Sequence, residues 1–204
     1  MPRDKTQTYQ KIIPAAKAEF LKKGFEQASL RNIAAEAGMS AAGLYRHFAD
    51  KEALFAALVD PVFVQLDSIY DTIRKRDYDY LKTGSLNEMW QDNAEIRYFL
   101  DLFYDNFEEF KLLLCCSAGT KYANFIHDFV MLEQEETLSY MEAARKQGIL
   151  VREVDPRELH LMLSAYVTAV FEVIIHDFSK EEAGHYLSTL QAFFYPGWRA
   201  VLGL

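Results

Sequence analysis

The stretch from residue 24 to residue 59 constrains the fold more than any other part of the chain. Gly24 and Gly38 are placed to end helices, because glycine adopts the left-handed conformation of a helix C-terminus without a steric penalty. Ser29 and Ser40 each precede an apolar-periodic segment, where a serine hydroxyl can accept a free backbone amide of the first turn. The pattern therefore predicts two short helices joined by a tight turn.

A further helix is predicted to follow this pair at once. The second short helix is expected to run through residues 41–48, with Leu44 and Phe48 facing inward. Asp50 is the expected N-cap of the next helix, and three apolar residues at helical spacing follow it: Leu54, Phe55 and Leu58. Such a unit can place its second helix in the major groove of DNA.

The side chains of the second short helix suit that placement. Small residues at positions 41–43 let a helix approach base edges, and alanine methyl groups can touch a thymine methyl. Lys51 lies in the first turn of the following helix, where free amides already favour a phosphate. The spacing alone leaves a second reading open, in which this is an ordinary helical hairpin with solvated polar residues. Further donors for phosphates or bases are Tyr45, Arg46 and His47.

Residues 12–59 resemble the DNA-binding domain of the TetR (tetracycline-repressor-like) family of transcriptional regulators. The matching residues are Ile13, Ala16, Phe20, Gly24, Phe25, Ser29, Ile33, Ala34, Ala37, Gly38, Ser40, Gly43, Leu44, Tyr45, His47, Phe48, Lys51, Glu52 and Leu54. The resemblance implies an all-α fold, with a three-helix helix-turn-helix domain followed by a larger helical domain for ligand binding and dimerisation. The DNA-binding set that we expect is Ser29, Ser40, Ala41, Ala42, Gly43, Tyr45, Arg46, His47 and Lys51.

Within that set, the resemblance assigns phosphate contacts to Ser29, Tyr45, His47 and Lys51, and places Ala41, Ala42, Gly43 and Arg46 against bases. Two positions depart from the family pattern. Positions 41 and 42 often carry a longer polar residue in the family, and both are Ala here. Arg46 is then the one obvious side chain for hydrogen-bonded readout. Pro14 also falls inside the first helix pattern, either as the first residue of a shorter helix or as a kink in a longer one.

Composition agrees with an all-α protein. Half of the 204 residues are hydrophobic, and the chain has only five Pro and nine Gly. The net charge of −8 divides unevenly: nine Lys and Arg against six Asp and Glu through Val59 give +3, and thirteen against twenty-four beyond it give −11. We therefore expect domains at residues 1–59 and 60–204, with the first binding DNA and the second acidic.

Helix signals continue beyond residue 60. A helix is predicted from Asp60 through Pro61 to about Arg76, with Arg74, Lys75 and Arg76 at its solvated end. Capping boxes are predicted at Ser85–Glu88 and Ser179–Glu182. Gly119 and Thr120 are expected to lead into a helix that ends near Gln147. Asp155 and Pro156 should start another that ends near Phe178, and Pro196 and Gly197 should interrupt the last helix with a kink.

The last two helices predict a dimer. Residues 159–175 are apolar on nearly every side, so one face needs cover beyond its own domain. A central core helix in a monomer is the alternative. A symmetric homodimer would present two recognition helices to a palindromic operator in double-stranded DNA. The expected interface residues are Tyr166, Val170, Ile174, Leu187, Leu190 and Phe194.

The middle helices carry many aromatic residues with polar groups among them, which suits a pocket for a lipophilic or aromatic small molecule. Plain core packing is the alternative at each position. The ligand would favour a conformation that releases the operator, with the helix from Asp60 to about Arg76 as the lever. The expected lining residues are Trp90, Tyr98, Tyr104, Tyr122, His127 and Tyr166.

Other sequence features point away from catalysis, a cofactor or a membrane. The adjacent Cys115 and Cys116 cannot form a disulfide framework and are interpreted as small buried hydrophobic residues rather than a redox pair. Glu172 and His176 lie one turn apart, a spacing that a metal could use but that is interpreted as a surface or interface hydrogen bond, and the histidines form no pair at short metal-ligand spacing. No signal peptide and no apolar run near membrane length is evident. The sequence thus predicts a cytoplasmic homodimeric repressor; the alternatives are a helical protein-interaction module without specific DNA binding and, more distantly, a pocket-bearing enzyme.

Overall fold

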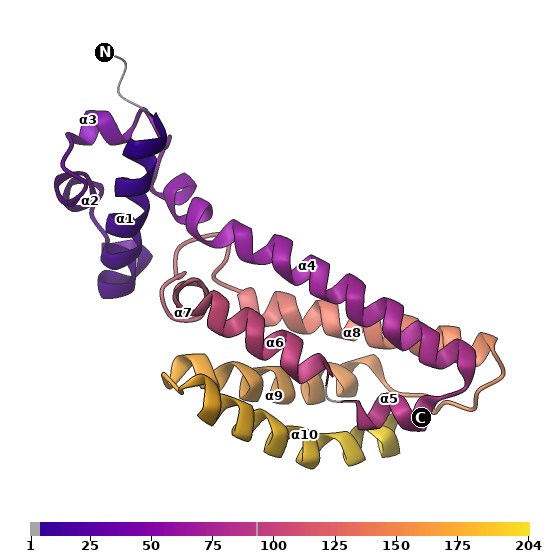
Figure 1. Ribbon diagram of the computed structural model, residues 1–204. Helices are drawn as coiled ribbons and strands as arrows, with labels where there is room; N and C mark the ends of the chain where they lie inside the picture. Colours follow the sequence, from indigo (N-terminus) through magenta and orange to yellow (C-terminus); the bar gives the residue numbers. More distant parts are fainter. Residues whose placement is uncertain (1–4, 93) are drawn as a thin grey trace. The chain divides into compact units, whose positions relative to one another are not determined.

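The computed structural model describes residues 5–92 and 94–204, which form ten α-helices and no strand (Figure 1). The predicted all-α fold class is confirmed. The helices are α1 (Lys5–Gln27), α2 (Leu30–Glu36), α3 (Ala41–Leu44), α4 (Lys51–Thr83), α5 (Leu86–Gln91), α6 (Ala94–Asp105), α7 (Phe107–Cys115), α8 (Phe125–Lys146), α9 (Pro156–Ile175) and α10 (Lys180–Leu202).

The chain divides into two compact units. The first unit comprises residues 1–65 together with 106–123, and the second comprises 66–105 together with 124–204. The sequence-based boundary between residues 59 and 60 thus falls inside α4. The segment 106–123, which contains α7, belongs to the first unit although it lies far from the others in sequence.

The core of the first unit is built on three phenylalanine rings. Phe20 of α1 lies 5.2 Å from Phe55 of α4, and Phe25 lies 5.5 Å from Phe55 between ring centroids. Helix α7 is tied to α1, because Lys17 Nζ lies 2.6 Å from the Glu109 carboxylate. The segment 106–123 is therefore part of the scaffold that holds the N-terminal helices.

The predicted caps around α2 and α3 are confirmed. Ser29 accepts a hydrogen bond from the Asn32 amide at 3.4 Å, and Ser40 accepts one from the Gly43 amide at 3.1 Å. Gly38 has φ 69°, as a helix-ending glycine requires. Helix α3 itself is shorter than the predicted 41–48, since it ends at Leu44 and hydrogen-bonded turns complete the path to residue 48.

Helix α4 corrects the prediction of a break at Pro61. Asp50 caps its start as expected, accepting from the Ala53 amide at 2.7 Å, but the helix continues without interruption to Thr83. Asp60 does not cap a new helix; its carboxylate accepts a hydrogen bond from the Tyr122 hydroxyl. Buried side chains on both sides of the proline favour continuity despite the lost backbone hydrogen bond: Leu58, Val59, Val62 and Leu66.

Pro14 likewise lies inside α1, so a helix that contains this proline, rather than one that begins at it, is observed. Gly24, with φ 71° and ψ 164°, is the non-helical residue near the end of α1, where the sequence placed a helix exit. A left-handed φ at this position favours glycine, because a side chain there would be strained.

The second unit is a bundle in which α8 packs along α9, and α10 packs against both α9 and α6 (Figure 1). Its core is aromatic: the Phe171 ring of α9 lies 5.3 Å from Phe103 of α6 and 5.2 Å from Phe129 of α8. The Tyr104 hydroxyl donates to the backbone oxygen of Phe178 at 2.6 Å and so fastens the α9–α10 connection to α6.

Two helix starts in this unit follow the prediction. Asp155 caps α9 by accepting from the Arg157 amide at 2.8 Å, and Ser179 and Glu182 form the predicted capping box of α10. The predicted Ser85–Glu88 box is absent, because Ser85 has ψ 41° rather than the extended backbone that directs a side chain onto the next turn.

Three further boundaries differ from the sequence predictions. Helix α8 begins at Phe125, some residues after Gly119 and Thr120, and α9 ends at Ile175 rather than near Phe178. The predicted interruption at Pro196 and Gly197 is wrong, since α10 runs through both to Leu202. Trp198 and Leu202, which follow the proline on this helix, are buried, and this packing favours a continuous helix over a break.

Helices α4 and α9 are each long and apolar enough, by length and composition, to cross a membrane. This corrects the expectation that no apolar run approaches that length. In α9 the composition has a local explanation, because one face carries core residues such as Phe171 while Leu161 on another face is 69% exposed. A core helix with a second apolar face can be as long and as apolar as a membrane-spanning helix.

Candidate nucleic-acid interface and internal cavity

The turn between α2 and α3 is fixed by backbone hydrogen bonds. The Met39 amide donates to the Ala34 carbonyl at 2.9 Å, and the Gly38 amide donates to Ala35 at 3.0 Å. Behind the turn, Ile33, Ala34 and Leu44 are buried at 0–1% exposure. The two short helices are therefore held rigidly, and the outer face of α3 is displayed on a preformed support.

The outer face of α3 combines small residues with a few exposed donors. Ala42, Tyr45 and Arg46 are exposed, and Tyr45 retains 54% of its surface. A Cβ added at Gly43 would meet Ser40 Oγ at 3.4 Å, an ordinary contact, so internal packing does not require glycine there. The absence of a side chain at Gly43 leaves room for an approaching partner instead. Of the other expected residues, Ser40 is exposed, and Ala41 and His47 are half-buried.

Two of the expected phosphate contacts already have partners within the first unit. The Ser29 amide donates to the Glu19 carboxylate at 3.1 Å, and its hydroxyl caps α2. Lys51 Nζ donates to the Glu26 carbonyl at 2.9 Å and to the Ala28 carbonyl at 3.3 Å. Lys51 thus fastens the start of α4 to the α1–α2 connection, and any phosphate contact would use its remaining donor.

The second unit contains a cavity of about 200 Å³. Helices α4, α5, α6, α8, α9 and α10 all contribute side chains to it. Its lining residues are Tyr70, Ile73, Arg74, Arg76, Asp77, Tyr78, Met89, Trp90, Glu95, Glu133, Glu136, Thr137, Tyr140, Leu163, Tyr166, Tyr195, Trp198, Leu202 and Leu204.

The structure brings two of the six expected pocket residues, Trp90 and Tyr166, into this cavity. The other four lie elsewhere. Tyr98 is 38% exposed, and the Tyr104 hydroxyl donates to backbone oxygens in the α9–α10 connection. Tyr122 belongs to the first unit, where it bonds Asp60. The His127 ring packs on that of His160, with 5.6 Å between centroids.

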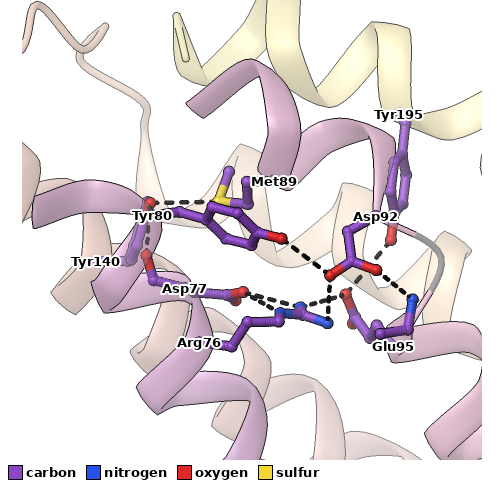
Figure 2. Close-up of polar contacts among 9 residues, drawn as sticks. Arg76, Asp77, Tyr80, Met89, Asp92, Glu95, Tyr140 and Tyr195 are labelled. Atoms are coloured by element: carbon purple, nitrogen blue, oxygen red, sulfur yellow. Dashed lines mark hydrogen bonds and ion pairs between the residues drawn. The ribbon is translucent and has the colours of Figure 1, made fainter. Parts of the chain in front are cut away.

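One half-buried arginine at the cavity, Arg76, was not expected there from the sequence. Figure 2 shows the Arg76 guanidinium surrounded by three carboxylates: Asp77 lies 2.8 Å away, Asp92 3.6 Å and Glu95 4.0 Å. The interpretation of residues 74–76 as a solvated helix end is therefore wrong for Arg76, whose side chain is only 19% exposed. Arginine side chains at a helix end are usually solvated, and only the tertiary fold brings these acids around one of them.

Glu95 and Glu133 were also missed as cavity residues. Burial raises the pKa of both carboxyl groups, and the nearby Glu95 charge helps to raise the pKa of Glu133 to about 7. A signal for both exists in the sequence. Glu95 precedes Phe99 and Phe103 at four-residue steps, and Glu133 follows Phe125 and Phe129 at the same step, so each acid continues an apolar stripe.

The expected dimer residues lie in the core of the second unit or beside its cavities. Ile174, Leu187 and Leu190 are buried at 0%, 4% and 9% exposure within the chain itself, because α9 and α10 pack these faces inward. Tyr166 lines the cavity, and Phe194 packs on it at 5.1 Å. Val170 is half-buried beside a smaller cavity. The large apolar residues that α9 and α10 do expose are Leu161, at 69%, and Phe193, at 77%.

The cysteines and histidines do not form a common site within the described residues. Cys116 is buried, as interpreted from the sequence, and burial raises the pKa of its thiol; Cys115, in contrast, is exposed. His176 Nε2 lies 2.9 Å from the Glu172 carboxylate, which confirms the predicted contact one turn apart. Within the described residues, no three His, Cys, Asp or Glu side chains are grouped to hold a metal ion.

Comparison with known proteins identifies the N-terminal part. Residues 12–58 match the family "Bacterial regulatory proteins, tetR family". The chain is 27% identical over 133 residues to an uncharacterized HTH-type transcriptional regulator, YfiR, of Bacillus subtilis (strain 168), covering 52% of this chain and 63% of that protein. The chain thus spans less than two thirds of this relative's length.

Solved structures extend the similarity to the whole fold. The fatty acid degradation regulator FadR from Bacillus halodurans superposes with a TM-score of 0.60 at 15% identity, covering 94% of this chain and 96% of that one. The transcriptional regulator FadR from Bacillus subtilis, solved in complex with stearoyl-CoA, gives 0.53 at 14% identity, covering 93% and 98%. At these identities the likeness shows the shared fold.

Proposed function

The chain belongs to the TetR family of bacterial regulatory proteins, and from that premise we propose that it is a DNA-binding transcriptional regulator. We assign DNA binding to residues 1–59 and regulation and dimerisation to residues 60–204. In this proposal the protein is a repressor in the bacterial cytoplasm. A small ligand releases it from a palindromic operator, and it catalyses no reaction itself.

The observation that carries this function is the outer face of α3. The turn behind it is fixed, its small residues permit close approach, and Arg46 is exposed at its end. The Arg46 Nε donates only a long 3.4 Å hydrogen bond to the Ala42 carbonyl, so a base edge can replace that acceptor. Arg46 is therefore the residue that we expect to read sequence.

Dimerisation is supported by the apolar surface that α9 and α10 leave uncovered. Leu161 and Phe193 are large hydrophobic side chains with most of their surface exposed, and both belong to the last two helices. Burial of such residues against the same surface of a second copy would stabilise a symmetric dimer. Two copies of α3 related by a two-fold axis would require an inverted repeat in the DNA.

Ligand control is supported by the cavity of about 200 Å³ in the second unit. Helix α4 contributes six of its lining residues, from Tyr70 to Tyr78, and begins at Lys51 next to the DNA-binding helices. A ligand that binds one conformation of the second unit more tightly would shift the population of that conformation. We propose that α4 transmits this shift because it is one continuous helix.

Selection from a library of random duplexes at near-physiological salt tests the proposed function. Wild-type protein should enrich an inverted repeat. The Ala42→Asp variant, which places a negative charge on the exposed face of α3, should enrich none while keeping its helical circular dichroism spectrum. Failure of the wild type to enrich any sequence would contradict specific DNA binding and favour a helical protein-interaction module.

A further inference from the structure

The two arginines of the cavity are already neutralised by partners. Arg74 donates to both oxygens of Glu136, at 3.0 and 2.5 Å, and Arg76 donates twice to Asp77 Oδ1, at 3.0 and 2.8 Å. The Arg74–Glu136 pair, with one hydrogen bond to each oxygen, is a strong arrangement of guanidinium and carboxylate, whereas Arg76 places both hydrogen bonds on one oxygen of Asp77 and its buried Nη1 has no hydrogen-bond partner among the described residues. Arg74 and Arg76 therefore contribute little further positive charge to the other acids of the cavity.

Glu95 and Glu133 are those remaining acids. Each receives a tyrosine hydroxyl: Tyr195 donates to Glu95 at 3.4 Å, and Tyr70 donates to Glu133. The nearest approach of a guanidinium to Glu95 is the 4.0 Å ion-pair contact with Arg76, which is already bonded to Asp77. With Arg74 and Arg76 paired to Glu136 and Asp77, the described lining of the cavity holds no further cationic side chain for these two glutamates.

Aromatic rings also line the same cavity. The Trp90 ring meets Tyr195 edge-on at 5.6 Å, and Tyr166 meets Trp198 edge-on at 6.4 Å. Faces of tryptophan and tyrosine rings attract a cation, most strongly where water is excluded. Glutamates without a full counter-charge and several aromatic rings are thus placed around one space.

We propose that this cavity binds a small organic cation, an amine or quaternary ammonium group on an apolar body, with its positive charge toward Glu95 and Glu133. The inference rests on the proposed function only in naming the class of ligand that would control DNA binding. A smaller cavity of about 50 Å³ shares Glu95, Glu133 and Tyr166 and is otherwise apolar, so it can take part of the ligand body.

Two further observations fit a ligand in this position. The Trp90 Nε1 and Arg76 Nη1 atoms are buried, and neither has a hydrogen-bond acceptor among the described residues, so an oxygen on the ligand body, apart from its cationic group, would satisfy them. Burial also raises the pKa of both glutamates, and a bound cation would favour their charged forms. An anionic ligand such as a carboxylate or phosphate ester would instead approach two carboxyl groups whose environment already disfavours negative charge.

The test uses three probes of similar size, one cationic, one neutral and one anionic, with purified full-length protein and no DNA. Benzyltrimethylammonium carries the cation, neopentylbenzene is its neutral isostere, and 3-phenylpropionate carries an anion. The chain's two tryptophans, Trp90 and Trp198, both line the cavity, so intrinsic fluorescence reports binding there, with calorimetry as a second readout. The cation should bind roughly tenfold or more tightly than either comparison probe.

Variants then test whether Glu95 and Glu133 attract the cation. The double variant Glu95→Gln, Glu133→Gln keeps the shape of both side chains. It should weaken binding of the cation by roughly tenfold or more and leave the affinity for the neutral isostere unchanged. Glu142→Gln is the matched control, because Glu142 is an exposed acid of α8 that pairs with Lys146. The probe comparison needs no variant, so the inference stays testable if the double variant fails to fold.

The inference is overturned if the neutral or anionic probe binds as tightly as the cation, or if none of the three binds at millimolar concentration. Retention of full cation affinity by a folded double variant also overturns it. Because no DNA is present, these outcomes are independent of the DNA selection. Cation binding without any enriched duplex would support the cavity and contradict the regulatory role.

Discussion

Replacing Glu133 with Gln should raise the stability of the protein at alkaline pH and leave it nearly unchanged at acidic pH. Burial and the Glu95 charge raise the pKa of the Glu133 carboxyl from 4.5 to about 7 in the folded state. A carboxyl with a raised folded pKa favours folding while it is protonated. That contribution is complete below pH 4.5 and is lost as the pH rises through about 7.

The size of the stability difference follows from the shift in the pKa of Glu133. Each pKa unit corresponds to 1.36 kcal/mol, so a shift from 4.5 to about 7 gives an upper limit of about 3 kcal/mol between acidic and alkaline pH. The groups that face Glu133 are Tyr70 and Asp77 of α4, Glu95 of α6 and Glu136 of α8. All of them remain in the Glu133→Gln variant, so the difference between variant and wild type isolates Glu133.

The assay is urea unfolding followed by circular dichroism at pH 5 and pH 8. The free energy of unfolding of Glu133→Gln minus that of wild type should grow by about 2–3 kcal/mol between these pH values. Glu142→Gln serves as the control, because the Lys146 partner lowers the pKa of this exposed carboxyl and the expected trend is therefore opposite in sign and small. A pH-independent difference for Glu133→Gln would refute the reasoning.

Three further perturbations test other parts of the molecule. Arg46→Ala should reduce the preference for operator over random DNA by about tenfold in a competition titration, whereas Arg157→Ala, whose side chain is 91% exposed at the start of α9, should not. Lys51→Ala should lower the free energy of unfolding by about 1 kcal/mol, since it removes the hydrogen bonds to the Glu26 and Ala28 carbonyls. It should also weaken binding to all duplexes alike; a loss of sequence preference alone would contradict a backbone-contacting role for Lys51. Phe193→Glu should shift sedimentation from dimer toward monomer, and the equally exposed control Val64→Glu should not; a dimer unaffected by Phe193→Glu would place the interface elsewhere.

The sequence predicted best those features that depend on neighbouring residues. The caps at Ser29, Ser40 and Asp155 form because each side chain needs only the backbone two or three positions ahead. Where packing competes with local preference, the prediction failed. Pro61 and Pro196 both lie inside continuous helices, since burial of the flanking apolar side chains outweighs the hydrogen bond that proline removes.

The cavity could not be predicted residue by residue for a different reason. Its charged groups come from helices that are distant in sequence, so that Arg76, Glu95 and Glu133 meet only in the folded bundle. The predicted pocket was based on the aromatic and polar residues of the middle helices, and it therefore included Tyr98 and Tyr122, which lie outside the cavity. A single acid at the end of an apolar stripe, as at Glu95 and Glu133, was the local clue that a buried polar site was present.

The central claim is sequence-specific DNA binding by a symmetric dimer. The most direct test compares three duplexes of equal length and composition at near-physiological salt: the enriched inverted repeat, the same repeat with one half-site scrambled, and a fully scrambled duplex. The account predicts that the intact repeat binds about 1,000-fold or more tightly than the scrambled duplex, and that loss of one half-site removes most of this gain. Equal affinity for all three duplexes would contradict it.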